Sequence, residues 1–425
     1  MTTIFLNRIN TTIIPSGKIR VEGLIKILIL YFFIFQPPFI SRASYFLIEF
    51  IILLLVLLIN PKIFLHPFKY FLSEAFLFLV IIMYSLLRDI IAGDEVFFLR
   101  NLSWAFQCFF FSIIIISFSA NRDYSPSSLN KVFSYAFWTI IIAGFFSVIL
   151  LANPAINDFY RSLIIIDPYE VEQFAAYRIR GFGIGESLTF TYPYLLGFAL
   201  GYLFFISNKK PLFLVFIPFL ALGIFFNARI GFIPIILFLL ILLLNKDGFK
   251  KISLISISAF FILLFLPLFP IYELISQNMD WVLSLFFGFS DLFEGNTSKG
   301  TLGILFSEAL IFPQDTISWI FGQGINLFFP PPGYKNSDIG YINQLNYGGL
   351  IFMSLLVMQF IFMAIRLYKK VGIFNWVFIT FTLSILFLNF KGSAFSSTPG
   401  TRFLYLIYVW AILLTIKSKE LVSDK

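Results

Sequence analysis

The chain has 425 residues, of which 59% are hydrophobic and only 12% charged, and its net charge at pH 7 is +8. A mean hydropathy of +0.93 and repeated apolar runs of about 20 residues match a bilayer core and exclude a soluble globular protein. The positive charge therefore reports on membrane topology and not on nucleic-acid binding. Cys108, the single cysteine, excludes an intrachain disulfide framework and a cysteine metal site.

The N-terminal twenty residues are polar, and the first apolar run begins at Gly23 with no small-residue cleavage site after it. We therefore expect an uncleaved first span and not a signal peptide. About twelve apolar segments follow, and each should be a helix because backbone groups in lipid must bond within their own segment. They lie at about 23–40, 44–60, 71–87, 102–119, 132–152, 187–206, 211–227, 230–244, 252–270, 347–365, 372–390 and 401–416.

The distribution of lysine and arginine sets the orientation. With both termini in the cytoplasm, most basic residues fall in or beside short cytoplasmic loops, as the positive-inside rule requires. The predicted fold is an all-α polytopic membrane protein forming a single transmembrane domain over residues 1–425. Two larger outer loops are predicted at 153–186 and 271–346, the second with short amphipathic helices that lie along the interface or cap the mouth.

The longest polar, turn-rich passage is FGQGINLFFPPPGYKNSDIGYINQLNYGG, residues 321–349. Its glycines and prolines interrupt regular helix, and its polar side chains gather just before the next span, where function is expected in a membrane protein. Asp338 in this passage could orient an acceptor hydroxyl, accept its proton, pair with an arginine or cap the next helix. Tyr341 and Asn343 are candidate substrate-binding residues.

Two arginines precede the sixth span in the sequence YRIRGFGIGES. Arg178 and Arg180 stand two residues apart before three glycines, which suits an anion held by forked donors and close backbone approach. The alternative is a positive flank that touches lipid headgroups. Glu186, at the head of the following helix, is interpreted as a cap or an arginine partner more readily than as a proton acceptor.

Arg229 lies between two short apolar segments, 211–227 and 230–244. Helices of this length extend about 22–26 Å, less than the ~30 Å hydrocarbon core. The turn that contains Arg229 should therefore sit below the outer surface, where a buried guanidinium needs an anion from the protein or from a ligand. The alternative is snorkelling of the side chain to the headgroups.

Lys391 and Arg402 bracket the last outer loop, KGSAFSSTPGTR. Ordinary flanking charge and ligand binding both remain open for each of them. Together with Arg178, Arg180 and Arg229 they form an outer set of cations that would suit a diphosphate at headgroup depth.

Three other ionisable residues stand out. His66, the only histidine, falls in a predicted cytoplasmic loop and is interpreted as solvated, which removes a histidine base from the outer face. Glu49 and Glu74 lie within apolar runs, where either could pair with a basic partner between helices. Glu49 is expected about 9 Å below the outer edge.

Several short motifs, added to this layout, resemble the bacterial O-antigen or capsule repeat-unit polymerases (Wzy), which are related to the O-antigen ligases. They are RIRGFGIGES, NARIGFI, IFGQGINLFF followed by SDIGYINQLNYGGL, and NFKGSAFSSTPGTRFLYL. The resemblance implies a metal-independent glycosyltransferase of the C-type membrane fold, without a cofactor, in the bacterial inner membrane. Such an enzyme moves a growing glycan from undecaprenyl diphosphate onto a new lipid-linked repeat unit at the periplasmic face, working with a chain-length regulator and a flippase.

Under this resemblance, Arg178, Arg180 and Arg229 are expected to stabilise the diphosphate, with Lys391 and Arg402 behind them. Asp338 and Glu186 are then the candidates for activating or aligning the acceptor hydroxyl. The ligases carry a histidine in the second large outer loop, where this chain reads SDIGY, which favours a polymerase. The alternatives are a ligase-type glycosyltransferase and a lipid-linked oligosaccharide flippase.

Overall fold

The computed structural model describes residues 21–93, 96–120, 124–165, 191–206, 215–227, 229–243, 310–328, 335–371 and 376–423. Within these ranges the regular structure is helical, with no strand. Six stretches are long and apolar enough to cross a membrane: Arg42–Ile59, Lys62–Ala92, Phe97–Ser119, Pro126–Leu150, Gly340–Lys369 and Pro399–Lys417. The prediction of a helical membrane protein is confirmed, while the number of twelve spans stays a prediction.

The described part of the chain begins with α2 (Val21–Phe35) and α3 (Arg42–Ile59), joined by a short link. The Ser41 hydroxyl caps α3 by accepting a hydrogen bond of 3.1 Å from the backbone amide of Ser44. Only Tyr45 and Glu49 of α3 are buried, so most of this apolar helix lies on the surface, as expected for a face in contact with lipid. A short α4 (Lys62–Phe68) and a 3₁₀ turn, η1 (Lys69–Phe71), lead into α5 (Leu72–Ala92).

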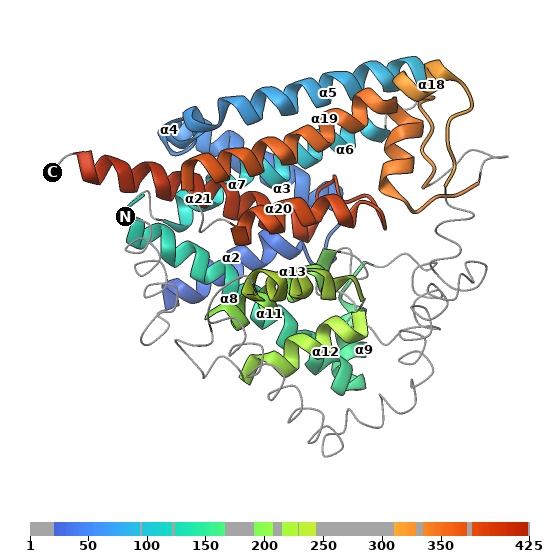
Figure 1. The fold of residues 1–425 in the computed structure, drawn as a ribbon. Coiled ribbons are helices and arrows are strands. Elements are labelled where there is room, and N and C mark those ends of the chain that lie inside the picture. The colour runs from blue at the N-terminus through green and yellow to red at the C-terminus, as the bar shows by residue number, and fades with distance from the viewer. Residues whose placement is uncertain are drawn as a thin grey trace.

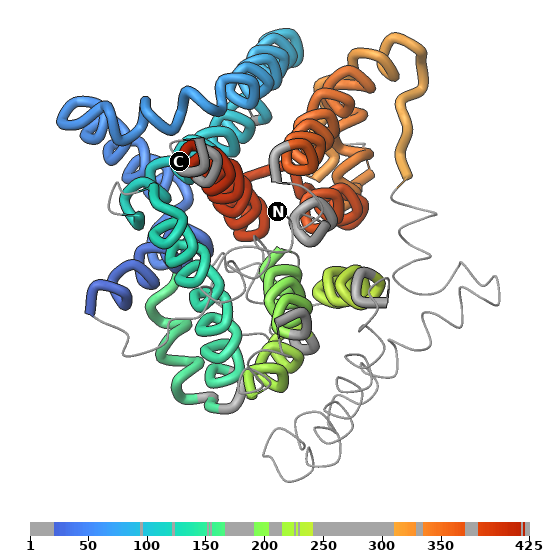
Figure 2. The backbone as a smooth tube through the Cα atoms, turned by 60° about the vertical axis from the view of Figure 1, so that its left-hand side comes forward, coloured from blue at the N-terminus to red at the C-terminus, as the bar shows by residue number. Residues whose placement is uncertain are grey.

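The next span is made of three consecutive pieces: α6 (Val96–Trp104), a π-helical turn η2 (Ala105–Phe110), and α7 (Phe111–Ser119). It is followed by α8 (Pro126–Ala152) and the short α9 (Pro154–Ser162), which lies inside the predicted loop 153–186. The last helix, α21 (Pro399–Ser423), is buried along most of its length. Figure 2 shows α21 (red) running through the middle of the bundle.

A compact unit is formed by α11 (Thr191–Ile206), α12 (Ile217–Asn227), the 3₁₀ turn η5 (Arg229–Gly231) and α13 (Phe232–Leu243). A Cβ on Gly197 of α11 would lie 1.8 Å from the carbonyl oxygen of Gly231. The turn between α12 and α13 therefore packs against the first two turns of α11, and only glycine at both positions permits that approach.

The polar passage holds α18 (Thr316–Phe321) and the start of α19 (Gly340–Val371), which is followed by α20 (Trp376–Leu388). The sequence predicts a span from about 347, but the helix already begins at Gly340 and bends at Gly349, whose φ is 69°. In Figure 1 the two parts of α19 (orange) meet beside α18. The polar residues before Gly349 are thus helical, because bonds from other segments satisfy them, as described below.

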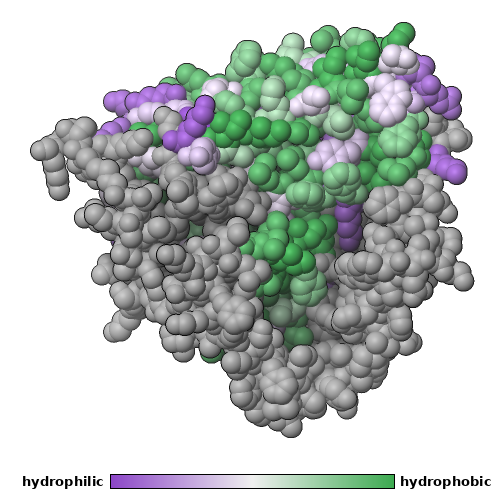
Figure 3. Space-filling view, viewed as in Figure 1, coloured by the Kyte–Doolittle hydropathy of each residue, from purple (hydrophilic) through white to green (hydrophobic). Residues whose placement is uncertain are grey.

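The surface pattern agrees with a membrane-embedded bundle. In Figure 3 hydrophobic side chains form a band along the upper helices, with hydrophilic side chains gathered at both ends. One end carries α4 and the C-terminal parts of α19 and α21, and the other carries α18 and the break in α19. We call the second the outer end, after the predicted orientation.

Candidate functional site at the outer end of α2, α3 and α21

Arg402, in the first turn of α21, is a fully buried arginine at the outer end of the bundle. Its Nε donates a hydrogen bond of 3.0 Å to the carbonyl oxygen of Ile34, at the end of α2. Its Nη1 donates to the side-chain oxygen of Gln36 and, at 3.2 Å, to the hydroxyl of Ser397. The guanidinium therefore ties α21 to the end of α2 and to the loop before α21.

Gln36 extends this contact to a buried carboxylate. Its side-chain nitrogen donates a hydrogen bond of 2.9 Å to Oε1 of Glu49, which is 5% exposed. Gln36 also has a φ of 40°, the one positive φ of a non-glycine residue in the described ranges. Such a backbone costs free energy and persists where the surroundings hold it, often at a functional site. We call this guanidinium, amide and carboxylate the Arg402–Gln36–Glu49 chain.

The loop before α21 is held by its own hydroxyl groups. Thr401 donates a hydrogen bond of 2.6 Å to the carbonyl oxygen of Ser396 and accepts one of 2.9 Å from the backbone amide of Thr398. The Cys108 thiol, in the π-helical turn η2, lies 3.5 Å from the same Thr401 hydroxyl. The start of α21 is thus fixed on two sides, which holds the guanidinium of Arg402 in place.

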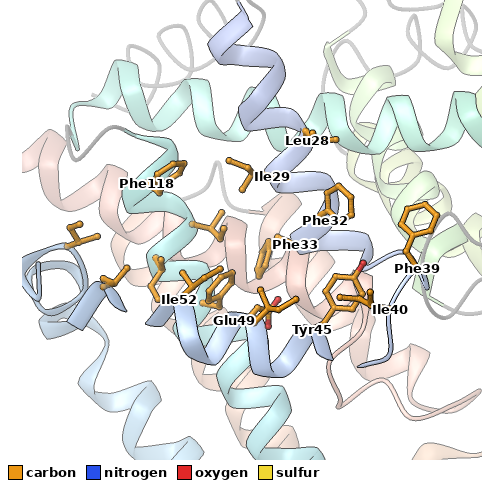
Figure 4. Close-up of a pocket in the computed structure, with 16 residues that line it drawn as sticks. Leu28, Ile29, Phe32, Phe33, Phe39, Ile40, Tyr45, Glu49, Ile52 and Phe118 are labelled. Atoms are coloured by element: carbon orange, nitrogen blue, oxygen red, sulfur yellow. The ribbon is translucent and has the colours of Figure 1, made fainter. Parts of the chain in front are cut away.

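An apolar groove of about 980 Å³ lies beside the Arg402–Gln36–Glu49 chain, with walls from α2, α3 and α7. Glu49 is the one ionisable carboxylate among the sixteen residues that line it, and most of the others are aliphatic or phenylalanine. Figure 4 shows Glu49 between Ile52 and Tyr45, with Phe33 close by. A groove of this composition accepts an apolar chain along its length and a polar group near Glu49.

The polar half-helix Gly340–Gly348 lies against the loop before α21. The side-chain amides of Gln344 and Asn389 bond each other at 2.9 and 3.2 Å, and Asn389 also accepts a hydrogen bond of 3.0 Å from the Ala394 amide. A Cβ on Gly340 would lie 2.3 Å from the Asn389 side chain. Tyr341 donates a hydrogen bond of 2.7 Å to the carbonyl oxygen of Leu386. The half-helix is therefore fixed to the end of α20.

The break at Gly349 leaves carbonyl groups that the helix does not bond itself. The carbonyls of Asn346 and Tyr347 accept from the backbone amides of Gln323 and Gly324, at 2.6 and 2.9 Å. The Gly348 carbonyl accepts a hydrogen bond of 2.7 Å from the hydroxyl of Tyr84 on α5. An interrupted helix whose polar backbone is buried in protein is a recurring feature of membrane functional sites.

The predicted site residues fall into two groups. Arg178, Arg180 and Glu186 lie outside the described residues, and of Arg229 the structure describes the backbone, in η5, but not the side chain. The others lie in or beside two segments, the half-helix and the loop before α21. Asp338 and Lys391 are exposed, Tyr341 is half-buried, and Asn343 and Arg402 are buried. Their roles in binding or catalysis stay predictions.

Two of these residues have structural partners that the sequence does not reveal. Asn343 donates hydrogen bonds of 2.6 and 3.0 Å to the carbonyl oxygens of Ser337 and Ile339, which holds the chain entering the half-helix. Arg402 faces protein groups from two segments, the end of α2 and the loop before α21. A contact between its guanidinium and a diphosphate would therefore require one of those segments to move.

Sequence analysis did not identify Gln36. The signal available was the pair of prolines directly after it, which disfavours helical backbone and marks the end of α2.

Glu74, which was considered for a basic partner, forms an ion pair with Arg366 at the opposite end of the bundle. Neither Gln36 nor Glu74 stands in a sequence pattern typical of a catalytic motif.

In the part of the chain that the structure describes, no three His, Cys, Asp or Glu residues are grouped as metal ligands would be. The chemistry that these residues can perform is that of hydrogen-bond donors, fixed positive charge and one carboxylate, Glu49, that lines an apolar groove. No family model, no curated protein and no solved structure matches this chain.

Proposed function

We propose that this protein is a membrane glycosyltransferase that polymerises lipid-linked oligosaccharide repeat units, an O-antigen or capsule polymerase. The observation that carries the proposal is the apolar groove that has Glu49, one member of the buried Arg402–Gln36–Glu49 chain, among its lining residues. A long apolar tail and a polar, charged head are the two parts of a polyprenyl diphosphate. The groove suits the apolar tail, and the diphosphate is proposed to meet the cations of the outer end, such as the exposed Lys391.

The position of the groove supports entry from the bilayer. One of its walls is α3, which has an apolar surface with large exposed side chains such as Ile48 and Ile52. A tail can therefore slide in sideways while its diphosphate stays at headgroup depth near the outer end. A water-soluble nucleotide sugar has no long apolar chain to bind in such a groove.

The proposed reaction needs positive charge more than it needs a strong base. The acceptor hydroxyl of one repeat unit attacks the anomeric carbon of the growing glycan, and the bond from that carbon to the diphosphate oxygen breaks. The diphosphate leaves with the electron pair, and the hydroxyl proton passes to a carboxylate or to water. Guanidinium groups fixed where this charge develops lower the barrier.

Arg178, Arg180 and Arg229 are our candidates for that stabilisation, together with Lys391 in the loop before α21. Arg402 supports that loop from beneath, through its hydrogen bond to Ser397. Asp338, exposed just before the half-helix, and Glu186 are the candidates for aligning the acceptor hydroxyl or taking its proton. Tyr341 and Asn343 are proposed to shape the acceptor side through the half-helix that they hold in place.

The test is the surface polysaccharide of a strain that lacks this protein. A polymerase predicts that the lipid A core carries one repeat unit and no ladder of longer chains, and that expression of the intact protein restores the ladder. Loss of all repeat units would instead indicate a ligase, which takes the same donor, or a flippase. An unchanged ladder would contradict each of these functions.

A further inference from the structure

The bundle end opposite the candidate site carries a row of basic residues. Lys62, His66 and Lys69 follow one another at spacings of four and three along α4 and η1, which places them on one face. All three are exposed, while Phe64 and Phe71 from the same segment are buried against the bundle. We call this face the Lys62–His66–Lys69 stripe.

Neighbouring helices add to its positive charge. Tyr70 brings the ends of α19 and α21 to the stripe, because its carbonyl accepts from Arg366 and its hydroxyl donates to Glu420 at 3.4 Å. Those helices contribute the exposed Lys369 and the partly exposed Lys417. Figure 3 shows the hydrophilic patch at this end, at the upper left.

In the described part of the chain, two carboxylates lie among these cations, and both are bonded to a cation. Glu74 is paired with Arg366, and Glu420 lies 2.7 Å from the ammonium of Lys417. The hydrogen bond from Lys417 lowers the pKa of Glu420 below its ordinary value. The described cations at this end are Lys62, Lys69, Arg366, Lys369 and Lys417, which outnumber these two carboxylates, so the patch keeps an excess of positive charge.

The stripe also lies at the edge of the apolar surface. Leu58 and Ile59, at the end of α3, are each 80% exposed, and Leu65 on α4 itself is 53% exposed. The rings of Tyr70 and Tyr124 lie 6.3 and 5.9 Å from that of His66. Exposed aliphatic side chains next to lysine, with tyrosine between them, are typical of headgroup depth.

We propose that the Lys62–His66–Lys69 stripe binds the phosphate groups of anionic phospholipids. The lysine ammonium groups contact the phosphate, while the acyl chains lie along Leu58, Ile59 and Leu65. The charge selects anionic over zwitterionic lipid, and the apolar neighbours select a lipid over a free anion. This site is independent of the glycosyltransferase proposal, since it lies at the other end of the bundle.

The experiment is thermal unfolding of the full chain in detergent with added phosphatidylglycerol, phosphatidylcholine or inorganic phosphate. The wild type should gain several degrees in Tm with phosphatidylglycerol, and clearly less with phosphatidylcholine or phosphate. The variant K62Q/H66Q/K69Q should lose most of that gain. In native mass spectrometry it should retain phosphatidylglycerol about fivefold more weakly for each lysine removed.

The matched control is Lys335→Gln, which removes an exposed lysine from the outer end and should leave the response to phosphatidylglycerol intact. The single variants Lys62→Gln and Lys69→Gln, each expected to lose part of the gain, give the result even if the triple variant is poorly folded. An equal gain with phosphatidylcholine would overturn the proposal, as would an equal loss in Lys335→Gln. A full response in the stripe variants would overturn it too.

Discussion

Gln36 and Glu49, from the end of α2 and the second turn of α3, are joined by a hydrogen bond of 2.9 Å within the protein. The same Gln36 side chain accepts from Arg402 through its oxygen. A single amide thus connects a buried guanidinium with a buried carboxylate and lets their charges compensate without direct contact. Burying either charge alone would cost several kcal/mol, so the amide holds three helices in one arrangement.

Replacing Gln36 should test that arrangement. We expect Gln36→Ala to destabilise the protein by about 1–3 kcal/mol, because it leaves hydrogen-bonding groups of Glu49 and Arg402 unsatisfied. Gln36→Gly removes the same side chain but suits the φ of 40°, so it should be less destabilising than alanine. Thermal unfolding in detergent measures both, and equal Tm values for the wild type and Gln36→Ala would show that the bridge contributes nothing.

A second prediction concerns the ion pair at the opposite end. Glu74 is fully buried and accepts hydrogen bonds from Arg366 and from the hydroxyl of Tyr408. Arg366→Met should cost about 3–5 kcal/mol, because a buried carboxylate is left without its counter-ion. Adding Glu74→Gln to that variant should recover much of the loss. Additive losses in the double variant would mean that the two residues act separately.

The sequence was most informative about helices and the ends of the bundle. Apolar runs predicted membrane helices, and the described residues contain six stretches long and apolar enough to be such helices. For Glu74, one of two glutamates considered for a basic partner, the structure shows that partner in Arg366. These inferences hold because the bilayer imposes length and polarity on each segment separately.

The candidate site was harder to predict, because it depends on contacts between distant segments. Gln344 of the half-helix bonds Asn389, 45 residues later, and no local pattern shows that pairing. The Gln36 side chain likewise bonds Glu49, 13 residues later, and Arg402, 366 residues later. Single-segment propensity contains no information about such partners.

The break in α19 gives a third prediction. A Cβ at Gly349 would lie 2.2 Å from the carbonyl oxygen of Ile320, and its φ of 69° is unfavourable for alanine. Gly349→Ala should therefore displace the segment that caps the break and reduce stability by more than the roughly 1–2 kcal/mol of left-handed backbone alone. Gly93→Ala is the control, because its φ is 74° but nothing lies within 4 Å of the added Cβ. Similar Tm values for the two variants would show that the contact between Gly349 and Ile320 adds little to stability.

The arginines assigned to the diphosphate give a fourth prediction, which rests on the proposed function. Arg180→Ala and Arg229→Ala should each abolish long glycan chains while the protein still inserts in the membrane at normal levels. The reason is that the leaving diphosphate then lacks a fixed positive charge where its own charge develops. Polysaccharide from complemented deletion strains, separated on a gel, is the measurement. If both variants still produce the full series of long glycan chains on the gel, these arginines are not needed for the reaction.

The last prediction tests whether the space inside the groove is needed for polymerisation. Ile52 lines the groove and is 37% exposed, so Ile52→Trp should fill part of its about 980 Å³ and compete with a lipid tail. Leu55, on the same helix and 48% exposed, does not line the groove, and Leu55→Trp adds the same ring to a surface that already faces lipid. We expect Ile52→Trp to shorten the glycan chains or raise the KM for the lipid-linked donor, with the Tm almost unchanged, and Leu55→Trp to behave as the wild type. If both variants polymerise normally, the tail lies elsewhere. If both fail, the surface of α3 as a whole matters, and the groove is not the reason.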